Sequence, residues 1–302
     1  MKLSLTENGG VSHWILVDTS AQPDDRAIYA SCESLRKPAL VRTSDGTLKE
    51  VISHGIGSVF CNPEYRGRGY AARMLKDLAP ILQEWQVEKG IPGREECKFS
   101  FLYSDIGKKF YANLGWLPFP SSHLTFKPSA SLTGSSLAKL LGYADLPALC
   151  QLDQQYLRRS LQNTKDSRPH VALVPDHDVM DWHHKREDFM TNKLFGKSPT
   201  TKGAIVGNEG ARLWAIWTRS FYGAIDDAKS GNTLHILRLV IEDEQAINAN
   251  AQALKAILNL AQVEATEYVH TCILLDLRLL TSLGGNAYML NSGIRLSRSR
   301  PW

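Results

Sequence analysis

The sequence predicts an α/β (α+β) protein whose central sheet is mixed and mainly antiparallel, followed by a second lobe built in the same order. Two observations carry this prediction. The first half alternates short runs rich in β-branched and aromatic residues with segments of helical periodicity, in the order strand, strand, strand, helix, strand, helix. The second half repeats much of this order after a short stretch of small residues, 129–136.

Length and composition allow two domains. The chain has 302 residues, of which 43% are hydrophobic, so each half can fill its own core. We therefore predict a first domain at 1–128, a linker at 129–136 and a second domain at 137–302. The 35 Lys and Arg residues against 31 Asp and Glu residues leave a net charge of only +4, without a basic block. This balance favours a small-molecule partner over a nucleic acid.

The five cysteines are an odd number, widely spaced and without a CxxC pair, which argues against a disulfide framework and against a zinc site. No apolar run approaches the roughly 18 residues of a membrane span, and the first residues lack an apolar leader core. We expect a cytoplasmic protein without a metal or a membrane partner. The oligomeric state is not predicted.

The first three strands are expected at 12–18, 26–32 and 54–61, and the first two form an antiparallel hairpin around a Pro-Asp-Asp turn. The third contains Gly55 and Gly57, which predict a bulge or a close approach of another molecule to the backbone. A polar loop containing Asp45 precedes it, and Asn62-Pro63 ends it.

An amphipathic helix is expected from Gly69 onward, because apolar residues recur at intervals of three and four as far as Trp85. Pro80 lies within this pattern and predicts a kink or an early end. A strand at 98–103 follows. A short helix is expected next, capped by Ser104 or Asp105 and ended by Gly115.

The segment that leads into the first helix reads Arg66-Gly67-Arg68-Gly69-Tyr70-Ala71. A loop between a strand and a helix presents unpaired backbone amides at the helix N-terminus, where the helix dipole favours an anion. Glycines let a phosphate approach the main chain, and arginines add charge-assisted hydrogen bonds. Taken alone, this run also fits an ordinary glycine and arginine turn. It lacks the endings that Walker and Rossmann phosphate loops require.

In this context the loop resembles the cofactor signature of GNAT N-acetyltransferases, and Arg66, Gly69 and Ala71 match its fixed positions. The later run Phe110-Tyr111-Ala112-Asn113-Leu114-Gly115-Trp116 is similar to another common GNAT segment. The resemblance implies that acetyl-CoA is the cosubstrate and that residues 66–71 bind it.

The same resemblance implies that the preceding strand splays from its neighbour, so that main-chain groups of Val59, Phe60 and Cys61 bind the pantetheine arm. It also implies that Tyr111 is the general acid for the departing thiolate, a role that suits a phenol with its pKa of about 10. The alternative for Tyr111 is packing on one face of a short helix.

Acetyl transfer needs a group that accepts a proton from the amine. Glu33, expected just after the second strand, and His54, expected at the start of the third, are the candidates. The alternative is a solvated carboxylate for Glu33 and a structural histidine for His54.

In the second half, strands are expected at 210–221, 233–241 and 271–275, with a helix from Ile247 to Ala261. The link before this helix, Glu242-Asp243-Glu244-Gln245, has no glycine and three acids, so it would repel a pyrophosphate. We therefore predict a degenerate GNAT-like lobe that does not bind coenzyme A.

A cluster of Asp and His residues at 176–184 invites a metal site, but His183 and His184 are adjacent and would diverge by about 100° on a helix. A helix start capped by Asp178 or Asp181 is the preferred interpretation.

Across nearly its whole length the chain resembles the fungal lysine N6-acetyltransferase family, notably in CESLRKPAL, EYRGRGYAARM, LYSDIGKKFYANLGW and PDHDVMDWHHKREDF. This resemblance implies acetylation of the N6 amine of L-lysine, and we expect Asp176 or Asp178 to bind the ammonium of the acceptor. Alternatives are a protein or secondary-metabolite amine, or a coenzyme A-binding protein with impaired catalysis.

The last alternative is suggested by two departures from the family pattern. Residues 12–18 look like the second GNAT strand, without the preceding strand and helix pair that usually wall the acceptor site. The end at 295–302 is more abrupt than the family pattern.

Overall fold

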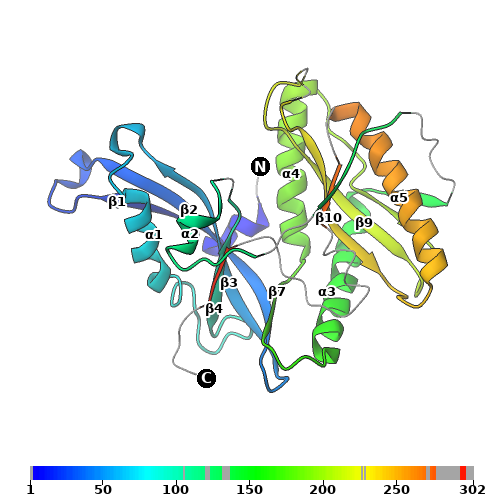
Figure 1. Cartoon of the computed structure of the whole chain (residues 1–302), viewed down its shortest axis with the longest axis horizontal. Helices are drawn as coiled ribbons and strands as arrows, with labels where there is room; N and C mark the ends of the chain where they lie inside the picture. The colour runs from blue at the N-terminus through cyan, green and yellow to red at the C-terminus, as the bar shows by residue number, and fades with distance from the viewer. Residues whose placement is uncertain are drawn as a thin grey trace. The chain divides into compact units, whose positions relative to one another are not determined.

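The computed structural model describes residues 3–104, 106–119, 123–130, 137–225, 227, 229–269, 273–276 and 293–296. The chain forms two compact units (Figure 1). Unit 1 comprises Met1–Pro120, Leu161–Val174 and Met289–Trp302, and unit 2 comprises Ser121–Ser160 and Pro175–Tyr288. Leu161–Val174 thus lies in unit 1, although the sequence pattern groups it with the second domain. Of the predicted linker and C-terminal end, residues 131–136 and 297–302 lie outside the described part.

Unit 1 is built on a mixed sheet, sheet A, with strand order β1-β2-β3-β4-β12 and with β7 beside β2. Strands β3 and β4 are parallel, and the other neighbours are antiparallel. Its strands are β1 (Val11–Val17), β2 (Ile28–Arg42), β3 (Leu48–Cys61), β4 (Cys97–Leu102), β7 (His170–Leu173) and β12 (Gly293–Leu296). Its helices are α1 (Tyr70–Ile81) and α2 (Lys108–Ala112).

The predicted order of unit 1 is confirmed, but β2 and β3 are much longer than their patterns indicated. They pair from Ala30↔Cys61 to Arg42↔Leu48. Buried residues of both strands, Ala39, Val41 and Val51, form one apolar cluster, and burial of this cluster favours continued pairing through the polar middle of the hairpin. Helix α1 ends at Ile81, one residue after Pro80, as the sequence predicted.

The predicted cap of α2 is wrong in one respect. The helix begins after Gly107, which has no side chain to cap it, and Ser104 instead accepts a hydrogen bond from the Ile106 amide at 3.2 Å. Asp105 lies outside the described residues.

One face of sheet A is covered by α1 and α2. Their apolar side chains pack on those of the strands in a single buried cluster, which comprises Ala30, Cys32, Ile56, Met74, Leu75, Leu78, Ala79, Leu82, Leu102, Tyr111 and Trp116. On the opposite face, Phe99 and Phe101 pack with residues of β7. Further along that face, Ile15 and Phe60 remain exposed, at 57% and 52% of their surface.

Unit 2 is built on sheet B, with strand order β5-β11-β10-β9-β8-β6. Its strands are β5 (His123–Phe126), β6 (Ala138–Leu141), β8 (Gly203–Val206), β9 (Leu213–Ser220), β10 (Thr233–Ile241) and β11 (Ile273–Asp276). Its helices are α4 (His177–Phe195), α5 (Ile247–Tyr268) and most of α3 (Leu146–Asn163).

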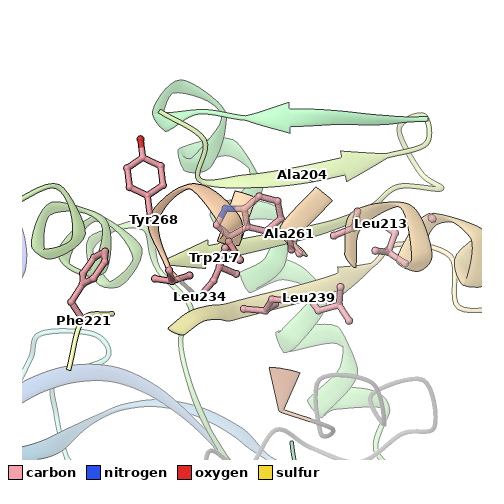
Figure 2. Close-up of a cluster of buried hydrophobic side chains, with 14 residues drawn as sticks. Ala204, Leu213, Trp217, Phe221, Leu234, Leu239, Ala261 and Tyr268 are labelled. Atoms are coloured by element: carbon pink, nitrogen blue, oxygen red, sulfur yellow. The ribbon is translucent and has the colours of Figure 1, made fainter. Parts of the chain in front are cut away.

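Helices cover sheet B on both faces, and every residue of β9 is buried. Trp217 and Leu213 of β9 pack toward α5, where Ala261 leaves room for large side chains (Figure 2). The alternate residues Trp214 and Ile216 pack with residues of α3 and α4. Alternate side chains of β9 therefore point to opposite faces of sheet B and pack in two separate apolar cores.

The expected second GNAT-like lobe is confirmed in its topology. In unit 1, β2 and β3 are antiparallel, α1 follows, and β4 returns parallel to β3. In unit 2, β9 and β10 are antiparallel, α5 follows, and β11 returns parallel to β10. The outer strands are exchanged in the chain: β5 pairs with β11 in sheet B, and β12 pairs with β4 in sheet A.

Candidate active site

The loop between β3 and α1 is shaped by its own side chains and by two glycines. Asn62 accepts a hydrogen bond from the Glu64 amide at 3.2 Å and starts a short turn. Gly67 and Gly69 then adopt φ values of +77° and +79°, which favour glycine. A Cβ at either position would meet no atom within 4 Å. The glycines therefore fit the backbone geometry and leave the space before the loop open.

The N-terminus of α1 offers backbone amides to an anion. Gly69 is the N-cap residue and supplies no side-chain acceptor, and the first turn contains no acidic residue. The amides of such a first turn have no partner within the helix, and the helix dipole makes their end positive. Arg66 and Arg68 precede them and are exposed. This arrangement fits a phosphate or pyrophosphate.

Aromatic rings fix the loop to the sheet. Tyr70, the first residue of α1, stacks on Tyr29 of β2 with ring centroids 4.5 Å apart, and Tyr65 meets Tyr29 edge to face at 4.9 Å. Arg66 lies over the Phe60 ring, and Arg68 lies over the Tyr65 ring, at 5.9 and 5.7 Å from the ring centroids. Sequence reasoning missed Tyr29, because its contacts depend on the strand pairing.

Strand β3 separates from β4 before it reaches the loop. The parallel pairing ends at Ile56↔Leu102, whereas β3 continues to Cys61 and pairs there with β2 alone. The main-chain edge of Val59 and Phe60 on the β4 side therefore has no strand partner and can meet an extended ligand. The carbonyl oxygen of Cys61 accepts a hydrogen bond from Arg66 Nε at 3.1 Å, so a ligand that binds this oxygen has to displace the arginine. A role of these three residues in binding pantetheine stays a prediction.

A bulge interrupts β3 at the same level. Glu33 pairs with Gly57 and Ser31 with Phe60, so two residues of β3, Ser58 and Val59, lie opposite Cys32. Ser58 has φ +52°, in the left-handed region. A bulge near Gly57 was predicted. Its position turns the end of β3 away from β4.

Tyr111 lies in α2 on the α1 side of sheet A and is 8% exposed. Burial raises the pKa of its phenol, a side-chain hydrogen bond with Ser104 lowers it, and the nearby Cys32 thiol raises it. The phenol therefore keeps its proton at neutral pH. It lies close to Cys32, opposite the bulge, and close to Ser104, just beyond the end of β4.

Glu33 lies on the other face of sheet A. The sequence pattern had placed Glu33 just after the second strand, but the residue lies within β2. Its Oε1 accepts a hydrogen bond from Ser58 Oγ at 2.7 Å. A Cβ at Gly57 would lie 3.3 Å from the same oxygen, so the carboxylate rests against the bare main chain of the bulge. The candidate acid, Tyr111, and the candidate base, Glu33, thus lie on opposite faces of sheet A. Both are near the place where β3 separates from β4.

His54, the other candidate base, lies in the middle of β3 and not at its start. It is fully buried, and its Nε2 lies 3.1 Å from the carbonyl oxygen of Trp85. Burial lowers the pKa of the imidazole to about 4. The ring is neutral at pH 7 and packs inside unit 1, which favours the structural alternative.

Asp176 and Asp178 begin α4 in unit 2. Asp176, and not Asp178 or Asp181, is the N-cap: its Oδ1 accepts a hydrogen bond from the Val179 amide at 2.9 Å. Asp178 lies in the first turn, where a carboxylate stabilises a helix. The binding of an acceptor ammonium by either residue stays a prediction.

The two adjacent histidines diverge. His184 is fully buried, and its Nε2 lies 2.9 Å from the Trp217 carbonyl oxygen. His183 stacks edge to face against Trp182 at 4.9 Å. Within the part of the chain that the structure describes, no cluster of three or more His, Cys, Asp and Glu side chains is arranged to hold a metal ion. No helix of the described residues is long and apolar enough to cross a membrane.

The chain is similar to one known family and to two known proteins of yeasts. The family model of the LYC1 GNAT-like C-terminal domain matches residues 123–274, about half of the chain. A lysine acetyltransferase of Yarrowia lipolytica is 28% identical over 232 residues, which cover 64% of this chain and 57% of that protein. An uncharacterized protein of Saccharomyces cerevisiae is 24% identical over 201 residues, which cover 61% of this chain and 49% of that protein. The chain thus spans about half the length of these relatives.

Among solved structures, the chain matches a GCN5-related N-acetyltransferase from Kribbella flavida with a TM-score of 0.43 and 16% identity. That match covers 89% of this chain and 56% of the other. A probable N-acyltransferase from Enterococcus faecalis gives a TM-score of 0.47 and 16% identity, with coverages of 90% and 58%.

Proposed function

The chain belongs to the family of the LYC1 GNAT-like C-terminal domain, and we propose that it is an N-acetyltransferase that moves acetyl from acetyl-CoA to a small primary amine. The observation that carries the proposal is the start of α1, where Gly67 and Gly69 leave space before a helix N-terminus flanked by two arginines. The described loop fits the pyrophosphate of coenzyme A in charge and in backbone access. Arg66, Gly67, Arg68, Gly69, Tyr70 and Ala71 are the proposed binding residues.

The unpaired edge at the end of β3 supports a binding path for the pantetheine arm of acetyl-CoA. Main-chain groups of Val59, Phe60 and Cys61 would bind the pantetheine amides in the manner of an added strand. The thioester would then lie beside the bulge, where β3 and β4 part. When bound, acetyl-CoA supplies an activated carbonyl group to the acceptor amine.

Two residues on opposite faces of sheet A support acid and base roles. Glu33 would accept the proton that the attacking nitrogen loses as the N–C bond forms and the C–S bond breaks. Tyr111 would protonate the departing thiolate, and burial helps by raising the pKa of its phenol so that the proton is present at neutral pH. His54 is buried and is not assigned a catalytic role.

The acceptor is proposed to be the N6 amine of lysine. One relative is named lysine acetyltransferase, and the resemblance of the sequence motifs points the same way. Free L-lysine, a lysine side chain of a protein and a secondary-metabolite amine share a primary amine on an alkyl stem. An assay with each of these amines as the acceptor distinguishes the three. A cytoplasmic location, as expected from the sequence, is proposed as well.

The test is release of free thiol from acetyl-CoA by the full chain, with L-lysine, a lysine-containing peptide and other alkyl amines as acceptors. Tyr111→Phe should lower kcat by about 10²-fold, within the range typical of general acid catalysis. Tyr222→Phe, which alters an exposed phenol in unit 2, is the matched control and should be neutral. Binding of coenzyme A in calorimetry, without thiol release for any amine, would favour the impaired binding protein.

A further inference from the structure

The bulge in β3 brings a hydroxyl and a carboxylate together on the face of sheet A that α1 does not cover. Ser58 Oγ donates to Glu33 Oε1 at 2.7 Å. The carboxylate lies over Gly57, where a side chain would crowd it at 3.3 Å. These two contacts hold one oxygen of Glu33 across the bulge. Among the described residues, Oε2 has no hydrogen-bond donor.

The residue type at position 58 is unusual for its backbone. Ser58 is one of two residues other than glycine with positive φ in the described part of the chain, the other being Gln86. Such a conformation is strained for a residue with a Cβ, and two glycines stand within three residues of it. Strain that persists at a specific place is a reason to ask what the side chain does there. Its hydroxyl contacts Glu33.

The surroundings of Glu33 fit a group that meets solvent and substrate. His13 of β1 lies directly opposite Glu33 in the strand register and is exposed. Cys32 is the neighbour on the strand, but it points to the other face and is 4% exposed. Phe60 lies next to the bulge and is half exposed. The titratable groups near Glu33 include His13 on its own face and the buried Cys32 thiol on the other.

We propose that Ser58 is a positioning residue for acetyl transfer, holding the Glu33 carboxylate so that Oε2 accepts the amine proton. This role rests on the proposed function. By binding Oε1, the hydroxyl fixes the orientation of the carboxylate, and a fixed base transfers a proton faster than a mobile one. The proton passes from the attacking nitrogen to Oε2, while the C–S electron pair leaves with sulfur and is protonated by Tyr111.

The test uses the full chain, acetyl-CoA and the best acceptor of the panel. Ser58→Ala should lower kcat about tenfold and leave the KM for acetyl-CoA unchanged. Ser58→Gly should lower kcat equally, although glycine adopts the bulge geometry without strain and keeps the fold stable. Ser58→Asn should recover most of the activity, since asparagine tolerates this backbone region and its amide can donate to Oε1.

A double-mutant cycle separates positioning from a structural role. In a Glu33→Gln background, Ser58→Ala should have no further effect on kcat, because two residues that act as a unit are not additive. Full kcat in Ser58→Gly, or independent effects of the two substitutions, would overturn the role of Ser58 and leave the acetyltransferase in place. A wild-type chain that releases no thiol would overturn both.

Discussion

Units 1 and 2 share the order of their central strands and long helix but differ in the turn before that helix. In both, the strand before the turn carries a bulge, at Ser58 in β3 and at Leu237 in β10. In unit 1 the turn is long, open and basic. In unit 2, Glu242 accepts hydrogen bonds from the backbone and side chain of Arg212, and Asp243 accepts one from the Gln245 amide. The proposed anion site therefore depends on the turn and not on the order of strands and helix that the two units share.

The two sheets differ as well. Sheet B is covered by helices on both faces, and its polar groups are buried in ion pairs: Lys202 bonds Glu187 and Asp188, and Arg219 bonds Glu187 and Glu264. Sheet A leaves Ile15 and Phe60 exposed around Glu33. The first arrangement suits a structural unit, and the second suits a surface that meets a substrate.

The largest expected effect comes from giving the turn of unit 1 the charge of the turn in unit 2. Arg66→Glu with Arg68→Glu should weaken coenzyme A binding by on the order of a hundredfold or more, since a hydrogen bond to a charged group contributes roughly 1.5–3 kcal/mol. Titration calorimetry with coenzyme A measures this. The matched control is Glu244→Arg, an exposed residue in the unit 2 turn, which should leave the affinity unchanged. Unaltered binding in the double variant would contradict the proposed site.

The second effect concerns the buried ion pairs of unit 2. Lys202→Met leaves Glu187, which is 1% exposed, with one cation fewer. Removing one partner of a buried pair costs about 3–5 kcal/mol of unfolding free energy. Denaturant unfolding at pH 7 gives the value. Lys197→Met breaks an exposed pair with Glu267 and should cost less than about 1 kcal/mol. Equal costs would show that the buried network does not stabilise unit 2.

The third effect is the pH dependence that His54 gives to unit 1. Burial lowers the pKa of its imidazole to about 4, from an ordinary value of about 6.5. The unfolded chain therefore binds this proton first, and the contribution present above about pH 6.5 is lost as the pH falls toward 4. The unfolding free energy should drop by about 2 kcal/mol between pH 7 and pH 5 from this residue.

His54→Asn removes the titration and can still donate to the Trp85 carbonyl. Its unfolding free energy, followed over the same pH range by denaturant titration, should depend less steeply on pH than that of the wild type. His13→Asn, which alters an exposed histidine of the same sheet, is the control and should keep the wild-type slope. A slope unchanged by His54→Asn would mean that the native imidazole takes up a proton as readily as the unfolded one.

The sequence predicts well those features that depend on the chemistry of a few neighbouring residues. The glycines at 67 and 69, the early end of α1 after Pro80 and the acidic turn at 242–245 follow from backbone preference and charge over a few residues. The long β2 and β3 hairpin was underestimated because buried residues on both strands sustain it across a polar stretch. The Glu33 and Ser58 contact requires the strand register, which no local pattern sets.

The burial of His54 could not be predicted from the sequence either. The residue is covered by the segment after α1, where Trp85 provides the carbonyl group that meets its Nε2. The pairing of β5 with β11 and of β12 with β4 joins residues more than a hundred positions apart. Such non-local contacts follow from the packing of the whole chain and not from any one segment.

The smallest effect decides between two roles of Asp176. As the N-cap of α4 it accepts a hydrogen bond from the Val179 amide, and Asp176→Ala should cost about 1 kcal/mol of stability. Asp176→Asn keeps a good cap but removes the charge, so its stability should match the wild type. If the carboxylate also binds an acceptor ammonium, Asp176→Asn should raise the KM for the amine while the KM for acetyl-CoA stays constant. An unchanged KM for the amine would leave Asp176 with its helix-capping role alone.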